Sequence, residues 1–205
     1  MLELRSVSCV RGCRTLFSAL NCTAAAGQLL RVTGANGSGK TSLLRLVCGL
    51  LPPTQGQVLW RGQSPAQQAE EFNRQLVYLG HGAALKDDLS SQENLGVACL
   101  LGGLAVTPGQ TRLALQQAGL AGHEPMLARQ LSQGQRRRVA LARLVLATGV
   151  PLWVLDEPFN ALDSNATGWL CELITAQLTR GGVVVLTSHQ ALPLDPLPGQ
   201  VLVAL

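Results

Sequence analysis

The stretch GANGSGKT, residues 34–41, combines glycines, a lysine and a threonine at spacings that suit phosphate binding. It fits the pattern G-x-x-x-x-G-K-[ST] and lies between a strand-like apolar run and a helix-like run. Glycines let backbone N–H groups and the start of the helix approach the phosphates. Lys40 is then expected to reach the β- and γ-phosphates, and the Thr41 hydroxyl to bind Mg²⁺. The residues predicted to surround ATP here are Gly34, Ala35, Asn36, Gly37, Ser38, Gly39, Lys40, Thr41 and Ser42.

A second chemical signal is the run LWVLDEP, residues 152–158, in which a hydrophobic strand ends in two acids. Asp156 is expected to lie near the Mg²⁺, either as a direct ligand or in its outer shell. Glu157 is expected to polarise the attacking water as a general base. Taken alone, two acids at a strand end could be solvated surface charge, and a glycine-rich turn could simply cap a helix. Together the two signals favour ATP hydrolysis.

Apolar runs bounded by glycine or polar turns predict the elements that position these residues. Short continuous apolar runs are typical of strands buried on both faces, and their alternation with helical patterns indicates an α/β fold with a mainly parallel sheet. Strands are predicted at 28–34, 57–60, 75–80, 151–156 and 182–188, a last edge strand at 201–205, and helices at 40–50, 111–120, 134–148 and 165–178. Residues 82–145 show helical patterns without strong strand signals, so we predict a small helical lobe inserted in a single domain, 1–205.

Composition limits the classes of protein that the chain can represent. With 47% hydrophobic and 14% charged residues among 205, it can bury a sizeable core. A net charge of +4 and 3% aromatic residues give no support for nucleic-acid binding. The start of the chain lacks the apolar core of a signal peptide, and no apolar stretch approaches the roughly 18 residues of a membrane span. Six cysteines without metal-ligand spacing suggest reduced thiols, in a protein that is cytosolic or peripheral on the cytosolic side of a membrane.

The stretch LSQGQRRRVALAR, residues 131–143, resembles the signature motif of ABC-type ATPases. NALD at 160–163 is similar to the D-loop of that family, and TSH at 187–189 matches its switch histidine. The resemblance implies the P-loop NTPase fold of an ABC nucleotide-binding domain. It also implies that two copies stack head to tail, with ATP between the phosphate loop of one and the signature of the other.

In this arrangement the resemblance gives roles to several further residues. Ser132, Gly134 and Gln135 would meet the γ-phosphate from the start of the signature helix, where Gln133 replaces the usual glycine. His189 would hydrogen-bond the γ-phosphate and hold Glu157 with its water. A strand-end histidine without a role is the alternative for His189.

Besides Gln133, two further positions depart from the usual ABC pattern. Arg11 stands where family members carry an aromatic residue that stacks on adenine, and it could stack similarly or be a plain solvated arginine. His81 stands at the position of a usual glutamine, twelve residues before Glu93. We predict that His81 is a coupling residue at the nucleotide site rather than a catalytic base, with a bystander in the loop as the alternative.

The chain resembles the ATP-binding subunits of cytochrome c maturation transporters, long labelled haem exporters. The resemblance rests on its short length, on His81 and on the stretches RTLFSAL, GQVLWRG and QRRRVALARL. This resemblance implies a peripheral subunit on the cytoplasmic face of the bacterial inner membrane that uses ATP and Mg²⁺. Its partners would be a membrane permease (the B subunit), other haem-handling membrane proteins and, with ATP, a second copy. Hydrolysis would drive release of a haem-loaded periplasmic chaperone, or haem export. The alternatives are the ATPase of another exporter, for a lipid, drug or ion, and a soluble assembly ATPase.

Overall fold

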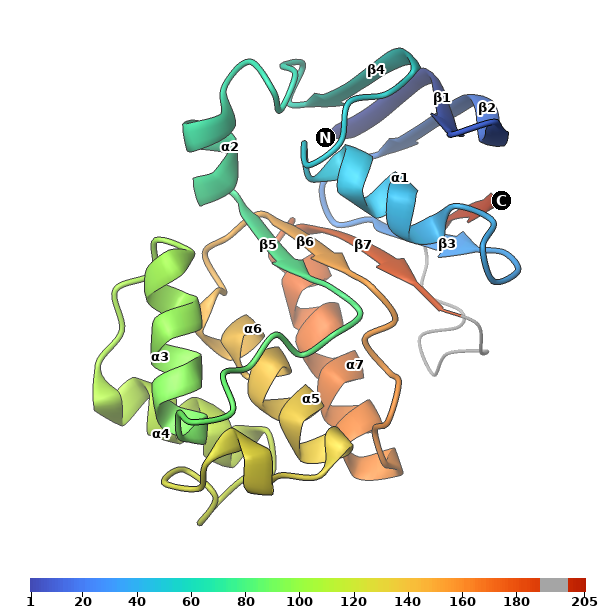
Figure 1. Ribbon diagram of the computed structural model, residues 1–205. Helices are drawn as coiled ribbons and strands as arrows, with labels where there is room; N and C mark the ends of the chain where they lie inside the picture. Colours follow the sequence, from blue (N-terminus) through green and yellow to red (C-terminus); the bar gives the residue numbers. More distant parts are fainter. Residues whose placement is uncertain (189–198) are drawn as a thin grey trace. The chain divides into compact units, whose positions relative to one another are not determined.

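The computed structural model describes residues 1–188 and 199–205, which form two compact units (Figure 1). Unit 1 comprises residues 1–78, 150–157 and 176–205, and unit 2 comprises residues 79–149 and 158–175. The elements in chain order are β1 (Leu2–Arg11), β2 (Arg14–Ala24), β3 (Leu29–Thr33), α1 (Lys40–Val47), β4 (Gln55–Trp60), α2 (Ala69–Arg74), β5 (Leu76–Leu79), α3 (Ser91–Leu101), α4 (Pro108–Gln117), η1 (Ala128–Gln130), α5 (Gln133–Leu141), α6 (Arg143–Leu146), β6 (Leu152–Leu155), α7 (Ser164–Thr179), β7 (Val183–Thr187) and β8 (Val201–Ala204).

The predicted parallel sheet is present, with the strand order β5-β6-β7-β3-β8. Strand β3 runs parallel to both β7 and β8, and β6 runs parallel to β7. Every residue of β6 and β7 is buried, as expected for runs of apolar residues covered on both faces. Because Val32 pairs with Thr187, and Leu155 pairs with Leu186, the carboxyl ends of β3, β6 and β7 share one edge of the sheet.

The prediction that 57–60 belongs to the parallel sheet is wrong. That segment is part of β4 in a separate antiparallel sheet of order β2-β1-β4, in which Leu2 pairs with Trp60 and Leu4 with Val58. The partner strand β1 was not predicted, because it alternates buried Leu2 and Leu4 with less buried residues instead of forming a continuous apolar run. A two-residue period is the mark of a strand with one face on the core.

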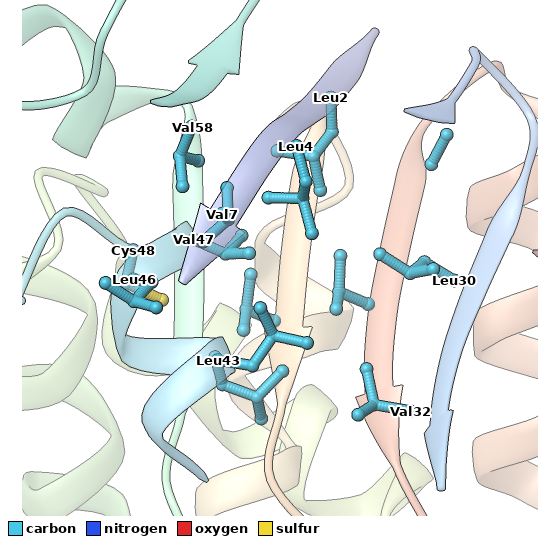
Figure 2. Packing of buried hydrophobic residues seen from close by; sticks show 14 of the residues in the cluster. Leu2, Leu4, Val7, Leu30, Val32, Leu43, Leu46, Val47, Cys48 and Val58 are labelled. Carbon is cyan, nitrogen blue, oxygen red and sulfur yellow. The ribbon is translucent and has the colours of Figure 1, made fainter. Parts of the chain in front are cut away.

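One hydrophobic core joins the two sheets of unit 1. Its buried side chains come from β1, β2, β3, β4, β6, β7, β8, α1 and α2. Figure 2 shows Leu4 and Val7 of β1, Val58 of β4, Leu30 of β3 and Leu43 of α1 among the side chains that fill this core. Helix α1 also contacts β6 and β7, so its first residue starts close to the carboxyl ends of the parallel strands. Packing therefore fixes where the phosphate loop meets the sheet.

Unit 2 contains α3, α4, η1, α5, α6 and the first part of α7. Its core includes Leu95, Leu115, Leu120 and Val139, all within 1% of complete burial. Helices α3, α4 and α5 each begin with a reciprocal capping box, in which the cap and the third helical residue satisfy each other's backbone N–H groups. Across the described part of the chain, no helix is long and apolar enough to cross a membrane. The lobe limits 82–145 and the single domain 1–205 remain predictions.

Candidate active site

The phosphate loop links β3 to α1 in unit 1, and two of its glycines are required by their surroundings. Gly34 has a φ of +148°, and a Cβ there would lie 2.5 Å from the carbonyl oxygen of Leu205. Gly39 is the N-cap of α1 with a φ of +110°, and a Cβ there would lie 3.0 Å from the Cβ of Leu16. Because a glycine cap has no side chain, the first N–H groups of α1 are left to bind an anion.

Side chains in and after this loop fit the phosphates of ATP. Lys40 is 6% exposed, and its ammonium donates to the carbonyl oxygens of Gly34 at 2.8 Å and Ala35 at 2.9 Å. This holds the charge of Lys40 over the loop. The Ser38 hydroxyl is buried and has no hydrogen-bond partner within the described residues. A buried hydroxyl in that state requires a partner, and a bound phosphate supplies one.

The two predicted metal ligands meet at the carboxyl edge of the parallel sheet. The Thr41 hydroxyl donates to Asp156 Oδ2 at 2.9 Å, and the Thr187 hydroxyl donates to Asp156 Oδ1 at 2.8 Å. Asp156 is 2% exposed, so its carboxylate is oriented by these contacts rather than by solvent. A hydroxyl beside a carboxylate provides the oxygen ligands that Mg²⁺ prefers, so the residues present fit that ion.

Glu157 follows Asp156 with a φ of +48°, an uncommon conformation for a residue with a side chain. Its backbone N–H donates to the Thr187 hydroxyl at 2.7 Å. Thr187 thus positions both acids, a role that was not predicted. The sequence did contain a signal for it, because a polar residue ends the apolar run that becomes β7.

The predicted signature residues lie at the start of α5 in unit 2. Ser132 is the N-cap, and its Oγ accepts from the Gln135 N–H at 3.2 Å while Gln135 Oε1 accepts from the Ser132 N–H at 2.8 Å. Because the Ser132 oxygen acts as an acceptor in this cap, its hydroxyl hydrogen can still donate outward. At Gly134, a Cβ would lie 2.7 Å from the carbonyl oxygen of Ala161, so glycine permits close packing against the 160–163 segment.

His81 lies in the loop after β5 and is an exposed residue. It lines a hollow of about 510 Å³ in unit 2 together with Gln133, Arg136, Arg137 and Asn160, among others. His81 and Gln133, two of the three positions that depart from the ABC pattern, therefore line the same hollow. This proximity was not predicted, because the two residues are far apart in the sequence.

The remaining predicted positions are placed as follows. Ala35, Asn36 and Gly37 are exposed in the phosphate loop, and Ser42 lies in the first turn of α1. Arg11 is exposed at the end of β1, where it pairs with Arg14 across the β1–β2 hairpin. The Arg14 guanidinium lies 3.8 Å from where a Gly37 Cβ would be, which makes Arg14 a cation beside the phosphate loop that sequence reasoning missed. His189 lies outside the described residues.

Comparisons with known proteins agree with this geometry. Residues 17–160 match the ABC transporter family. The chain is 47% identical over 98% of its length to the cytochrome c biogenesis ATP-binding export protein CcmA of Albidiferax ferrireducens, covering 95% of that protein. The protein of the same description from Pseudomonas aeruginosa is 48% identical, with 95% of each chain covered. The chain belongs to this family of ABC transporter ATP-binding proteins.

Solved structures support the fold of an ABC transporter ATP-binding protein. A putative ABC transporter ATP-binding protein from Pyrococcus furiosus superposes with a TM-score of 0.84 at 25% identity, covering 100% of this chain and 96% of the other. A dimeric ATP-binding cassette in a post-hydrolysis state with ADP and Pi superposes with a TM-score of 0.80 at 23% identity, covering 93% and 88%. The chain is therefore an ABC-type ATPase with a P-loop NTPase fold.

Proposed function

We propose that this protein is the ATP-hydrolysing subunit of a transporter complex for c-type cytochrome biogenesis. The observation that carries the proposal is the meeting of Thr41, Asp156, Thr187 and Glu157 beside the phosphate loop, in a chain that aligns over nearly its whole length with proteins of that description.

In unit 1, the residues divide the work of hydrolysis. The Lys40 ammonium, which donates to loop carbonyl oxygens in this structure, binds the β- and γ-phosphates of ATP. The N-terminus of α1 adds backbone N–H donors. Thr41 and Asp156 would hold Mg²⁺, which neutralises phosphate charge when bound. The Glu157 carboxylate takes a proton from the attacking water. The backbone N–H of Glu157 is anchored by the Thr187 hydroxyl. His189 is proposed to hold the γ-phosphate and this water.

In unit 2, the start of α5 is proposed to act on ATP held by a second copy. The Ser132 hydroxyl would donate to the γ-phosphate, and the Gln135 and Gly134 backbone would add the positive end of a helix. An ATP-bound homodimer would thus complete two sites. The dimeric cassette with ADP and Pi supports this association through its shared fold.

The proposed place of the protein is peripheral, on the cytoplasmic face of the inner membrane, bound to the permease B subunit and to haem-handling membrane proteins. The relatives are described as ATP-binding export proteins of cytochrome c biogenesis, which supports a membrane transporter as the partner. His81 would then transmit movements of the permease to the nucleotide site, and hydrolysis would drive haem export or the release of a haem-loaded chaperone. Arg11 would stack on adenine.

Complementation tests this function directly. In a bacterium lacking its own cytochrome c biogenesis ATPase, the wild-type chain is expected to restore haem-stained c-type cytochromes, while Glu157→Gln, at similar abundance, is not. Affinity purification from detergent-solubilised membranes should recover the permease with both proteins. Normal cytochrome levels with Glu157→Gln, or recovery of a different exporter's permease, would overturn the proposal.

A further inference from the structure

Arg137 is a buried cation at the centre of the functional segments of unit 2. Only 5% of the residue is exposed. Its Nη1 donates to the carbonyl oxygens of Gly80 at 2.8 Å and His81 at 3.1 Å, and its Nε donates to that of Pro158 at 3.4 Å. One side chain on the signature helix therefore holds the backbone of the His81 loop and the residue that follows Glu157.

The neighbouring arginines on α5 have different surroundings. Arg136 forms an ion pair with Asp87 at 2.7 Å, and both side chains are partly exposed. Arg138 donates to the carbonyl oxygen of Gly119, in the segment after α4, at 3.2 Å. Of the three arginines, Arg137 is the one that bridges segments lining the hollow that contains His81, Gln133 and Ala161.

The physical cost of this arrangement argues for a specific role. Burying a guanidinium is costly unless its N–H groups find acceptors, so the carbonyl oxygens and Arg137 depend on each other. A planar guanidinium can donate in several fixed directions, whereas a lysine ammonium is a compact charge on a flexible stem. Lysine at position 137 would therefore keep the charge but not hold all three carbonyl oxygens at once.

A second close contact links the same parts. Gly134, one turn before Arg137, packs so tightly on Ala161 that no side chain would fit. The start of α5 is thus attached to the 158–161 segment by packing, and to both that segment and the His81 loop by Arg137. A displacement of any one of these segments must move the others or break these contacts.

We propose that Arg137 is a positioning residue that makes the His81 loop, the signature and the segment after Glu157 move as one body. Nucleotide binding does not need this link, because the phosphate loop lies in unit 1. Turnover needs it, because His81 and Ser132 must take their places together. The kinetic part of this inference rests on the proposed function, whereas the structural part does not.

Hydrogen–deuterium exchange tests the structural part without requiring hydrolysis. In the full chain, Arg137→Gln is expected to speed amide exchange at least about fivefold in peptides covering 80–83 and 158–162, and to leave 34–41 unchanged. Arg138→Gln, on the same helix, is the matched control and should leave all of these peptides unchanged. Equal exchange of the 80–83 peptide in the two variants would overturn the proposal. Arg137→Lys, which retains the charge, should give an intermediate increase in amide exchange. It replaces Arg137→Gln as the test variant if Arg137→Gln folds poorly.

Steady-state kinetics test the consequence. For Arg137→Gln, kcat is expected to fall about tenfold or more, with KM for ATP changed by less than about twofold, and Arg137→Lys should recover part of the loss. Arg137→Gln combined with His81→Ala should turn over no more than about threefold more slowly than the slower single variant, since both act through one loop. If the kcat losses of the two single variants multiply in the double variant, or if kcat of Arg137→Gln is unchanged, the positioning role is overturned.

A wild-type chain without ATPase activity, alone or with its permease, would instead count against the proposed function. The exchange result would still decide on the structural link.

Discussion

The two units hold their functional groups by different means. In unit 1, hydroxyls from separate elements position the acids: Thr41 and Thr187 both donate to the Asp156 carboxylate, and Thr187 also accepts from the Glu157 backbone N–H. In unit 2, Ser132 sits at an exposed helix start and is fixed by the backbone of its own cap. This difference indicates that the side chains of unit 1 converge on a ligand at the edge of the sheet. In unit 2, by contrast, the Ser132 hydroxyl is free to donate to an acceptor outside α5. Changes in the two units should therefore affect different steps.

The largest expected effect is in unit 1. Glu157→Gln should lower kcat at least about a hundredfold, because an amide cannot accept the proton of the attacking water. ATP binding should be nearly unchanged, since Lys40 and the loop remain in place. Single-turnover hydrolysis and equilibrium binding of a fluorescent ATP analogue measure the two effects. Glu172→Gln, an exposed acid on α7, is the control; wild-type turnover by Glu157→Gln would remove Glu157 from the chemistry.

A smaller loss is expected from Thr187→Val, which removes one hydroxyl at nearly constant volume. Thr187 is completely buried, so both the Asp156 carboxylate and the Glu157 N–H lose a partner. We expect a roughly tenfold lower kcat and about 1–3 kcal/mol lower free energy of unfolding. Denaturant unfolding and ATPase rates measure these quantities. Thr187→Ser restores the hydroxyl and should behave almost like wild type; if serine fails as well, packing rather than hydrogen bonding explains the role.

In unit 2, Ser132→Ala sharpens the comparison because the same hydroxyl caps α5. Loss of the cap should cost about 1 kcal/mol of stability, and loss of the donor should reduce turnover about tenfold without weakening ATP binding to the isolated chain. Thr107→Ala removes the corresponding cap of α4, which also has glutamine at its third position. It should cost similar stability and leave turnover intact. If Ser132→Ala and Thr107→Ala lose equal ATPase activity, the effect of Ser132 is explained by helix capping alone.

Sequence reasoning could predict the parallel sheet of unit 1 because its signals are local and its central strands are continuous apolar runs. The phosphate loop, Lys40, Thr41 and Asp156 lie within two such strand–loop stretches, and a parallel sheet necessarily brings the ends of its strands together. The antiparallel pairing of β1 and β4 was missed because it depends on register between distant segments.

Two cations beside predicted site residues had no local signal that distinguished them in the sequence. Arg137 looks like one of three equivalent arginines in the sequence, and only the fold shows that it is buried against Gly80 and His81. Arg14 is one of many exposed arginines until the hairpin brings it near Gly37. Which cation of a basic run becomes buried is decided by helix phase and by the loops that pack on it, and neither can be deduced from residue type.

The smallest expected effect concerns the helix starts of unit 2. In α3 the capping box uses Glu93, and hydrogen bonds from the Ser90 hydroxyl and N–H lower the pKa of this carboxyl below its usual 4.5. A carboxyl whose pKa is lowered in the folded state stabilises the protein at pH values above its ordinary, unfolded-state pKa. That stability is lost as the pH falls through the folded-state pKa. Glu93→Gln should therefore lower Tm by about 2 °C or less at pH 7, and the difference from wild type should shrink toward zero below about pH 4. Gln110→Glu in α4 is the reverse change and should raise Tm at pH 7 but not in acid; a Tm difference independent of pH would show that the charge of the third residue adds nothing to these caps.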